Sequence, residues 1–229
     1  MPTITIHHNA NIFQWPTPNA IFQPRSLVLG SFNPHNPNRE NVDYYYGRPT
    51  NHFWKSVAQI RGLPDNTFLG IGTLPIKLSI MHKQFCCLDI IDSIKLTCDD
   101  GNVLNHFIQT KIFSGFNDSI IFRNQTQHLG TIIYINRIYN NSILNTLNTS
   151  PTIDSIIHTM GTKRLWGKPG VWNWRNPSPA DLNNFMTPIK NMNNIKFINL
   201  SFSPSGYAIN NGSTPLQSLN TWMQKYLHL

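Results

Sequence analysis

Acidic side chains are scarce in this sequence. Its 229 residues contain 10 Asp and Glu against 18 Lys and Arg, which gives a formal net charge of +8 at pH 7. A small protein with such an excess of positive charge commonly binds a polyanion, and nucleic acid is the usual one. The charge alone therefore predicts a nucleic-acid-binding protein, with a generally basic surface as the alternative.

Long apolar runs are also missing. No stretch reaches the roughly 18 consecutive apolar residues that a membrane-spanning helix needs, although 40% apolar residues are enough for a hydrophobic core. The first residues, MPTITIHHNANIFQW, lack a basic region followed by an apolar one, so we expect no signal peptide. These observations predict a cytoplasmic protein without membrane contact.

The common signatures of metal and cofactor sites are absent. The three cysteines, Cys86, Cys87 and Cys98, form no C-x-x-C pair and are too few for a four-thiolate iron–sulfur cluster. There is no glycine-rich phosphate loop and no G-x-S-x-G nucleophile motif. We therefore expect no metal, no cofactor and no covalent nucleophile, and we expect three buried free thiols.

What the sequence does contain is an alternation of strand and helix patterns. Apolar, β-branched runs predict strands at 27–32, 85–94, 119–124, 131–136 and from 196 onward. Helical spacing of apolar residues predicts helices at 52–63, 103–113, 141–148 and 215–229. This alternation predicts an α/β fold with a mostly parallel central sheet. No linker divides the chain, so residues 1–229 are predicted to form one domain, with a Trp-rich and basic insertion at about 150–195.

Two polar, proline-containing loops follow predicted strands. The first is GSFNPHNPNRENVDYYYGRPTNHFW (30–54), and the second is SFSPSGYAINN (201–211). Ligands of open parallel sheets bind outside the carboxyl ends of the strands, so we expect both loops to face one cleft. The first loop offers amides and aromatic rings; the second offers hydroxyls, backbone N–H groups and an apolar tip. Such a cleft suits a flat heterocycle whose edge makes hydrogen bonds.

Further motifs occur in a fixed order along the chain. They are Leu29–Pro34, Tyr45–Trp54, Leu88–Ile91 followed by Cys98, Ile135–Asn136, and Ser201–Gly206 followed by Trp222. This order resembles the uracil-DNA glycosylase superfamily, most closely its branch of mismatch-specific and hypoxanthine-DNA glycosylases. The resemblance implies a three-layer α/β/α sandwich with a short, mostly parallel central sheet. It also implies a monofunctional DNA glycosylase, which flips out an unusual base and hydrolyses its bond to deoxyribose.

The resemblance implies roles for particular residues. Asn33 or Asn51 would position the attacking water; the alternatives are a turn residue before Pro34 and a helix cap. The base would lie against Gly30, Ser31, Phe32, Tyr45, Tyr46, Phe53 and Asn136, although Phe53 also fits the core and Asn136 a turn. DNA contacts would come from Arg48, Phe202, Ser203, Pro204, Ser205, Gly206 and Tyr207, and from Lys168 and Arg175 in the insertion. Phe202 or Tyr207 would fill the gap that the base leaves.

Several alternatives stay open on the sequence alone. The excised base could be a deaminated one, such as uracil or hypoxanthine, or a bulky modified cytosine of phage DNA in antiviral defence. A protein of the same fold that binds DNA without catalysis, and an enzyme acting on free nucleosides or RNA, are the competing functions. The partner expected in the first two cases is double- or single-stranded DNA, and we expect a monomer.

Overall fold

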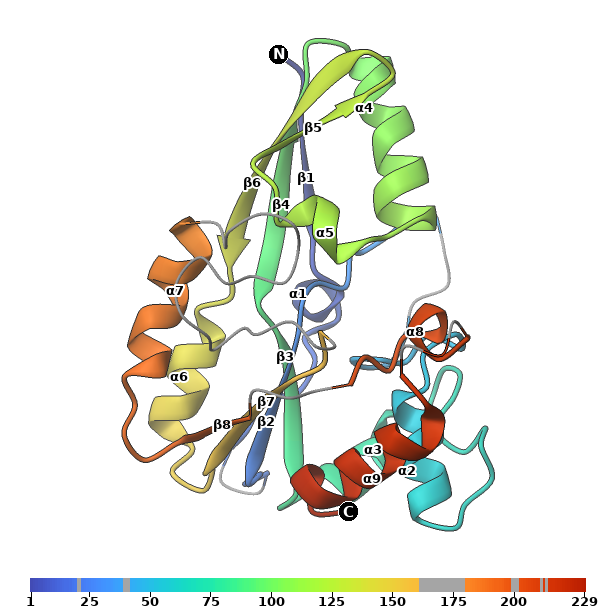
Figure 1. The fold of residues 1–229 in the computed structure, drawn as a ribbon, viewed down its shortest axis with the longest axis vertical. Coiled ribbons are helices and arrows are strands. Elements are labelled where there is room, and N and C mark those ends of the chain that lie inside the picture. The colour runs from blue at the N-terminus through green and yellow to red at the C-terminus, as the bar shows by residue number, and fades with distance from the viewer. Residues whose placement is uncertain (20–21, 39–41, 161–179, 199–201, 211, 213) are drawn as a thin grey trace.

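The computed structural model describes residues 1–19, 22–38, 42–160, 180–198, 202–210, 212 and 214–229. The chain has an α/β fold with two four-stranded sheets (Figure 1). One sheet is parallel, with the strand order β3-β2-β7-β8. Its strands are β2 (Ser26–Gly30), β3 (Phe85–Asp89), β7 (Ser155–His158) and β8 (Lys196–Ile198). Every residue of β2, β3 and β7 is buried, as expected of parallel strands covered on both faces.

The other sheet is antiparallel, with the strand order β1-β4-β6-β5. Its strands are β1 (Thr3–His7), β4 (Ile91–Thr97), β5 (Gln125–His128) and β6 (Thr131–Tyr139). Along β6 buried and exposed residues alternate, so one face of this sheet is packed and the other is open to solvent. The sequence patterns did not predict this second sheet.

One extended segment joins the two sheets. β3 ends at Asp89 and β4 begins at Ile91, so only Ile90 separates an outer strand of the parallel sheet from an inner strand of the antiparallel one. The backbone of β2 continues its hydrogen bonds past this point, because the Ile90 and Ile91 N–H groups donate to the carbonyls of Gly30 and Ser31, both at 3.0 Å. Asp89 therefore lies where the first loop leaves the parallel sheet.

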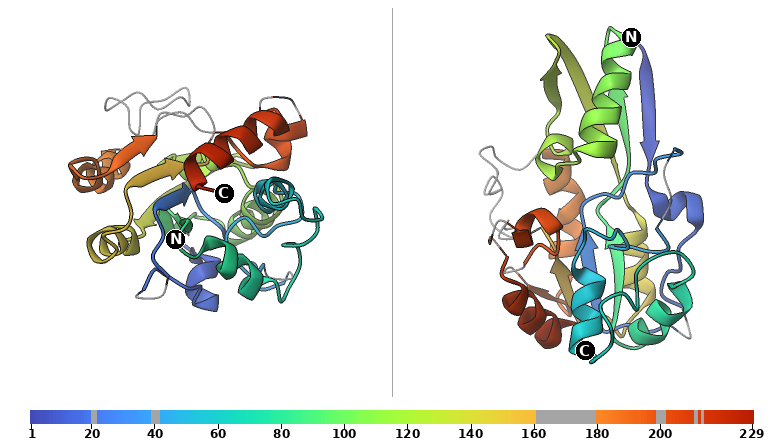
Figure 2. Two further views of the ribbon diagram at one scale, coloured as in Figure 1. Left: turned by 90° about the horizontal axis from the view of Figure 1, so that it is seen from below. Right: turned by 90° about the vertical axis from the view of Figure 1, so that its right-hand side faces the viewer.

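Helices flank both sheets. Figures 1 and 2 show α6 and α7 on one side of the parallel sheet and α2 and α9 on the other. α4 and the π-helix Ile108–Ser114 lie along the antiparallel sheet. Within the described part of the chain, every helix is too short or too polar to cross a bilayer. The α-helices are α1 (Asn9–Phe13), α2 (Phe53–Ile60), α3 (Leu74–Met81), α4 (Gly101–Phe107), α5 (Asp118–Ile121), α6 (Ser142–Thr149), α7 (Ala180–Lys190), α8 (Gly206–Asn210) and α9 (Leu216–Leu227).

Most predicted elements are confirmed, with shifted boundaries. The strand predicted at 119–124 is wrong: residues 118–121 form α5, because the Asn117 side chain accepts a hydrogen bond from the Ser119 N–H at 2.9 Å and caps a helix there. The range predicted as an insertion begins with β7, an interior strand of the parallel sheet, and ends with α7; residues 161–179 between them lie outside the described residues. The prediction of three buried free thiols is confirmed.

Candidate functional site

A cleft of about 1320 Å³ opens at the carboxyl ends of the parallel strands. Four segments supply its walls, at residues 30–33, 48–52, 114–118 and 202–208. Residues 114–118 connect the π-helix to α5, so they belong to the helices beside the antiparallel sheet. The cleft therefore lies between the two sheet units, at the edge where α/β proteins bind ligands.

The two loops predicted to face one cleft meet there. Asn51 and Ser205 form an isolated antiparallel bridge, and the His52 N–H donates to the Pro204 carbonyl at 2.7 Å. The backbones approach so closely at Gly206 that a Cβ atom there would come within 2.4 Å of the Thr50 carbonyl oxygen. Glycine at position 206 is thus required by this contact and not by its own backbone angles.

Asn33 and Asn51 both line the cleft, but their amide oxygens have different surroundings. Asn33 Oδ1 accepts two hydrogen bonds, from Asn9 Nδ2 and from an Arg48 guanidinium nitrogen, both at 3.1 Å. Asn51 Oδ1 accepts one, from the Phe53 N–H at 2.9 Å, at the start of α2. An amide oxygen has two lone pairs, so Asn51 can still accept a hydrogen bond from a water molecule while it accepts one from the first residue of α2.

Of the aromatic residues predicted to hold a base, the structure brings only some to the cleft. Phe32 and Tyr46 line it, whereas Tyr45 and Phe53 do not. Phe53 is fully buried and stacks behind Tyr46, with ring centroids 4.5 Å apart. Tyr45 is 3% exposed and packs against Trp15 and Tyr44. Both therefore belong to the core, which was the alternative for Phe53.

Tyr46 is held in an uncommon conformation. Its φ angle is 59°, in the left-handed region that aromatic residues seldom adopt. Its ring stacks on Phe53, and its hydroxyl lies 2.9 Å from Thr159 Oγ1. Burial, and then the nearby Asp89 charge, raise the pKa of Tyr46, so its hydroxyl keeps its proton. Residues that several contacts hold in an unfavourable backbone conformation cluster at functional sites.

One other predicted site residue lies away from the cleft, and two fall outside the residues that the structure describes. Asn136 is exposed on β6 of the antiparallel sheet, opposite Lys95, and does not line the cleft. The structure thus does not support its assignment as a base contact, because β6 continues past it to Tyr139. Lys168 and Arg175 lie outside the described residues.

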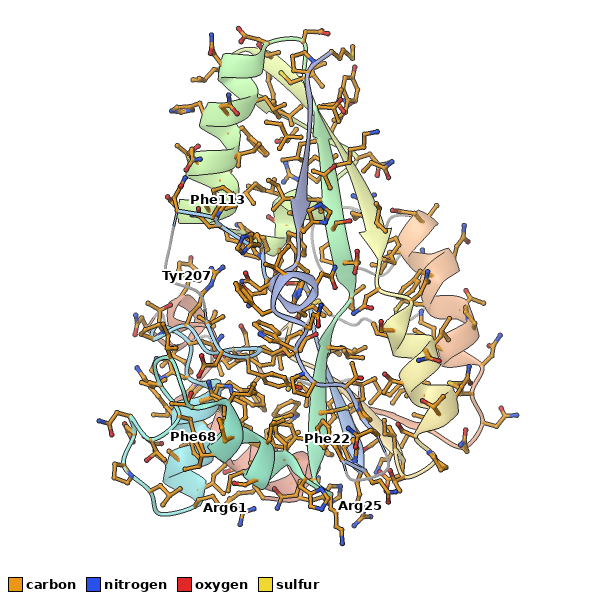
Figure 3. The ribbon with its side chains drawn as sticks, turned by 180° about the vertical axis from the view of Figure 1, so that it is seen from behind. Phe22, Arg25, Arg61, Phe68, Phe113 and Tyr207 are labelled. Atoms are coloured by element: carbon orange, nitrogen blue, oxygen red, sulfur yellow. The ribbon has the colours of Figure 1, made fainter. Side chains whose placement is uncertain are left out.

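The predicted DNA-contacting residues of the second loop all line the cleft, and so does Arg48. Phe202 is partly buried, with its ring 6.4 Å from Trp222, whereas Tyr207 is 82% exposed. Figure 3 shows Tyr207 on α8, below the end of the π-helix that carries Phe113. Ser205 Oγ accepts from the Ala208 N–H at 3.2 Å and caps α8, and Ser203 Oγ lies 3.1 Å from it. Pro204, between them in the chain, is buried.

Two carboxylates in the cleft were not predicted as site residues. Asp89 ends β3 and lines the cleft, and its Oδ2 lies 2.7 Å from His8 Nε2. Asp118 begins α5 and accepts a short hydrogen bond from the Ser31 hydroxyl, across the cleft. Asp89 lies in a motif of the family resemblance, but no local pattern pairs it with His8, 81 residues earlier.

The charges in the cleft are divided. The cationic Arg48 and Lys55, with His52 between them, come from the first loop and α2, whereas the two carboxylates come from the end of β3 and the start of α5. Partial burial and then the Lys55 ammonium lower the pKa of His52, so this imidazole is neutral at pH 7. The cationic side suits phosphates, and the carboxylates suit groups that donate hydrogen bonds.

Comparisons with protein-family models, with curated proteins and with solved structures found no match for this chain. In the described residues, no three His, Cys, Asp or Glu side chains are grouped so that they could hold a metal ion.

Proposed function

We propose that this protein is a monofunctional DNA glycosylase, with the three-layer α/β/α arrangement of the uracil-DNA glycosylase superfamily. The observation that carries the proposal is the meeting of the two loops at the carboxyl edge of the parallel sheet, joined by the Asn51–Ser205 bridge. The parallel strand order and the helices on both sides of that sheet are consistent with it. The excess of positive charge fits a DNA substrate.

The reaction needs no metal or covalent nucleophile. A flipped base enters the cleft, and its C1′–N bond breaks with the electron pair leaving on the base. A water oxygen then bonds to C1′, and a water proton passes to the released base. Asn51 is the residue that positions this water, because its Oδ1 keeps a lone pair while the Phe53 N–H fixes its orientation. Asn33 holds Arg48 at the cleft.

Tyr207 is the residue that fills the gap in the duplex. Of the two candidates on the second loop, Phe202 packs near Trp222, whereas Tyr207 projects into solvent at the cleft's edge. An exposed aromatic ring can stack between base pairs and so offset part of the energy of unstacking. Phosphates next to the flipped nucleotide would meet Ser203 and the backbone near Gly206.

The base is either a deaminated one or a bulky modified cytosine. The cleft volume of about 1320 Å³ exceeds the roughly 300–1,000 Å³ of ordinary small-molecule pockets. Part of that volume must hold the sugar and phosphates, so the size allows a substituted base and does not require one.

A panel of duplex and single-stranded oligonucleotides, each with one test base, tests this proposal. Abasic sites are detected by strand cleavage after heating in alkali. We expect one class of base to be released, with no strand cleavage before alkali. Asn51→Ala is expected to slow release by about 10²–10³-fold, with Asn145→Ala, an exposed Asn on α6, as the matched control.

The competing function gives a different result in the same assay. An inactive DNA-binding protein would bind duplex, release no base from any oligonucleotide, and keep its affinity in Asn33→Ala and Asn51→Ala. Turnover of free nucleosides or of RNA, without turnover of DNA, would also contradict the proposal.

A further inference from the structure

Asp89 is one of the few buried polar residues that line the cleft. The residue is 5% exposed and ends β3, beside the carboxyl end of β2. Its Oδ2 is held by His8 at 2.7 Å. Its Oδ1 lies toward Gly30, where a Cβ atom would come within 2.1 Å of it. Oδ1 receives no hydrogen bond from any residue that the structure describes.

The neighbours of His8 fix which atom carries the proton. His8 Nδ1 accepts a hydrogen bond from the Ala10 N–H at 2.9 Å, so this nitrogen must present its lone pair. Nε2 then carries the hydrogen and donates it to Asp89 Oδ2. A carboxylate held in this way is oriented by one oxygen, and the other oxygen remains able to accept a hydrogen bond from a ligand in the cleft.

The buried part of the cleft suits the base and not the sugar. A flipped nucleotide enters base first, because its sugar stays connected to the backbone at the mouth of the cleft. Asp89 therefore faces the edge of the base. The rings of Tyr46, Phe32 and Phe116 also line the cleft, and the last two have centroids 6.3 Å apart.

We propose, on the basis of the proposed glycosylase function, that the excised base is one that carries an exocyclic amino group, and that Asp89 Oδ1 accepts a hydrogen bond from that group. Cytosine N4 and adenine N6 are donors, whereas uracil O4 and hypoxanthine O6 at the same positions are acceptors. A carboxylate oxygen facing a carbonyl oxygen is repulsive and leaves both without a donor. Asp89 thus selects a modified amino base, such as a substituted cytosine or adenine, against its deaminated counterpart.

Matched pairs of substrates test this inference. Each pair has the same substituent and differs only in the amino or keto group: 5-hydroxymethylcytosine against 5-hydroxymethyluracil, and 8-oxoadenine against 8-oxohypoxanthine. We expect the wild-type protein to release the amino member faster by at least about tenfold. Asp89→Asn, whose amide can donate to a carbonyl, is expected to move this ratio toward the keto member by about 10–100-fold.

The ratio separates base recognition from a structural role. If Asp89 served only the packing, Asp89→Asn would slow both members equally. An unchanged ratio, or a wild-type preference for the keto member, would overturn the inference. The wild-type preference can be measured even if the variant does not fold.

Binding separates this inference from the proposed function. The same pairs are placed in duplexes with a 2′-fluoroarabino sugar, which resists hydrolysis, and their affinities are compared. Preference for the amino member in binding, without release of any base, would keep the inference and contradict the glycosylase. Release of bases without such a preference, in rate or in binding, would keep the glycosylase function and contradict the inference about Asp89.

Discussion

At the scale of single residues, Gly30 is the position where one added carbon should matter most. A Cβ atom there would lie 2.1 Å from Asp89 Oδ1 and 2.9 Å from the Tyr46 hydroxyl. Neither side chain can move freely, since Asp89 is held by His8 and Tyr46 by Phe53 and Thr159. Gly30→Ala is therefore expected to displace the carboxylate and to lower base release by about 10²-fold or more.

Thermal unfolding and base release measured together check this prediction. We expect the melting temperature to fall by a few degrees, because overpacking costs about 1–3 kcal/mol. The control is Gly101→Ala at the start of α4, where the nearest atom to an added Cβ is 3.6 Å away on Pro2. Full activity in Gly30→Ala would show that Asp89 has no part in holding the base.

At the scale of elements, local sequence patterns predicted the strands and helices whose formation depends mainly on residues close together in the chain. β2 was predicted from an unbroken apolar run, and α2 and α9 from helical spacing, and all three form as expected. A short apolar run such as 119–124 fits either a strand or a buried helix. There the cap supplied by Asn117 favours the helix.

The antiparallel sheet was not predicted from the sequence, and the reason differs. Its strand β6 exposes Ile132, Tyr134 and Ile138, so the strand lacks the polar alternation that marks a sheet with one open face. Its partner β4 follows β3 after one residue, so the apolar run predicted as one strand at 85–94 forms two strands in different sheets. The pairing of β4 with β1 and β6 is set by tertiary contacts that no window of sequence contains.

Some residues of the candidate site could also be predicted from the sequence, and others could not. The rule for parallel sheets was enough to place both polar loops at one edge, and Asn33, Asn51 and Tyr207 all line the cleft there. Tyr45 and Phe53 could not be told from the cleft aromatics, because spacing does not show which side of a loop faces the core. The contact between His8 and Asp89 depends on β1 lying beside β4, which the sequence did not indicate.

Within α3, Lys77 is a buried cation whose effect on stability should depend on pH. Its side chain is fully buried, and its Nζ has no hydrogen-bond partner among the described residues. Burial lowers its pKa from 10.5 to about 8, against the opposing charge of Asp43. At pH 7 the ammonium is charged in both the folded and the unfolded states, so the full cost of burying it is present. Lys77→Met is then expected to raise the free energy of unfolding by about 1–3 kcal/mol.

The pH dependence gives the sign of the effect. Between about pH 8 and pH 10.5 the unfolded chain keeps the Lys77 proton and the folded chain loses it, so wild-type stability gains with rising pH. The advantage of Lys77→Met should therefore be largest below pH 8 and smaller at pH 9.5. Urea unfolding at several pH values measures it, with the exposed Lys95→Met as control. An advantage that grows with pH would contradict this account.

At the scale of the whole molecule, the excess of 18 basic over 10 acidic side chains predicts DNA binding that weakens with salt. Each phosphate contact contributes about −0.9 to the slope of log K against log salt concentration. Lys55 lines the cleft, whereas Lys196 begins β8 at the opposite, amino end of the parallel sheet. The two residues carry the same charge at opposite edges of the sheet, so a comparison of their variants tests which edge faces the DNA.

Lys55→Gln is expected to make the salt slope shallower by about 1, and Lys196→Gln is expected to leave it unchanged. Tyr207→Ala should act differently, because its ring stacks and neutralises no charge. It should weaken binding to duplexes with a flipped base by about 10–100-fold, through a loss of about 1–3 kcal/mol of stacking, at an unchanged slope. Fluorescence anisotropy from 50 to 300 mM salt measures all three variants. Equal slopes for the two lysine variants would place the DNA elsewhere on the protein. The charge at the cleft would then contribute no more to DNA binding than the charge at the far edge.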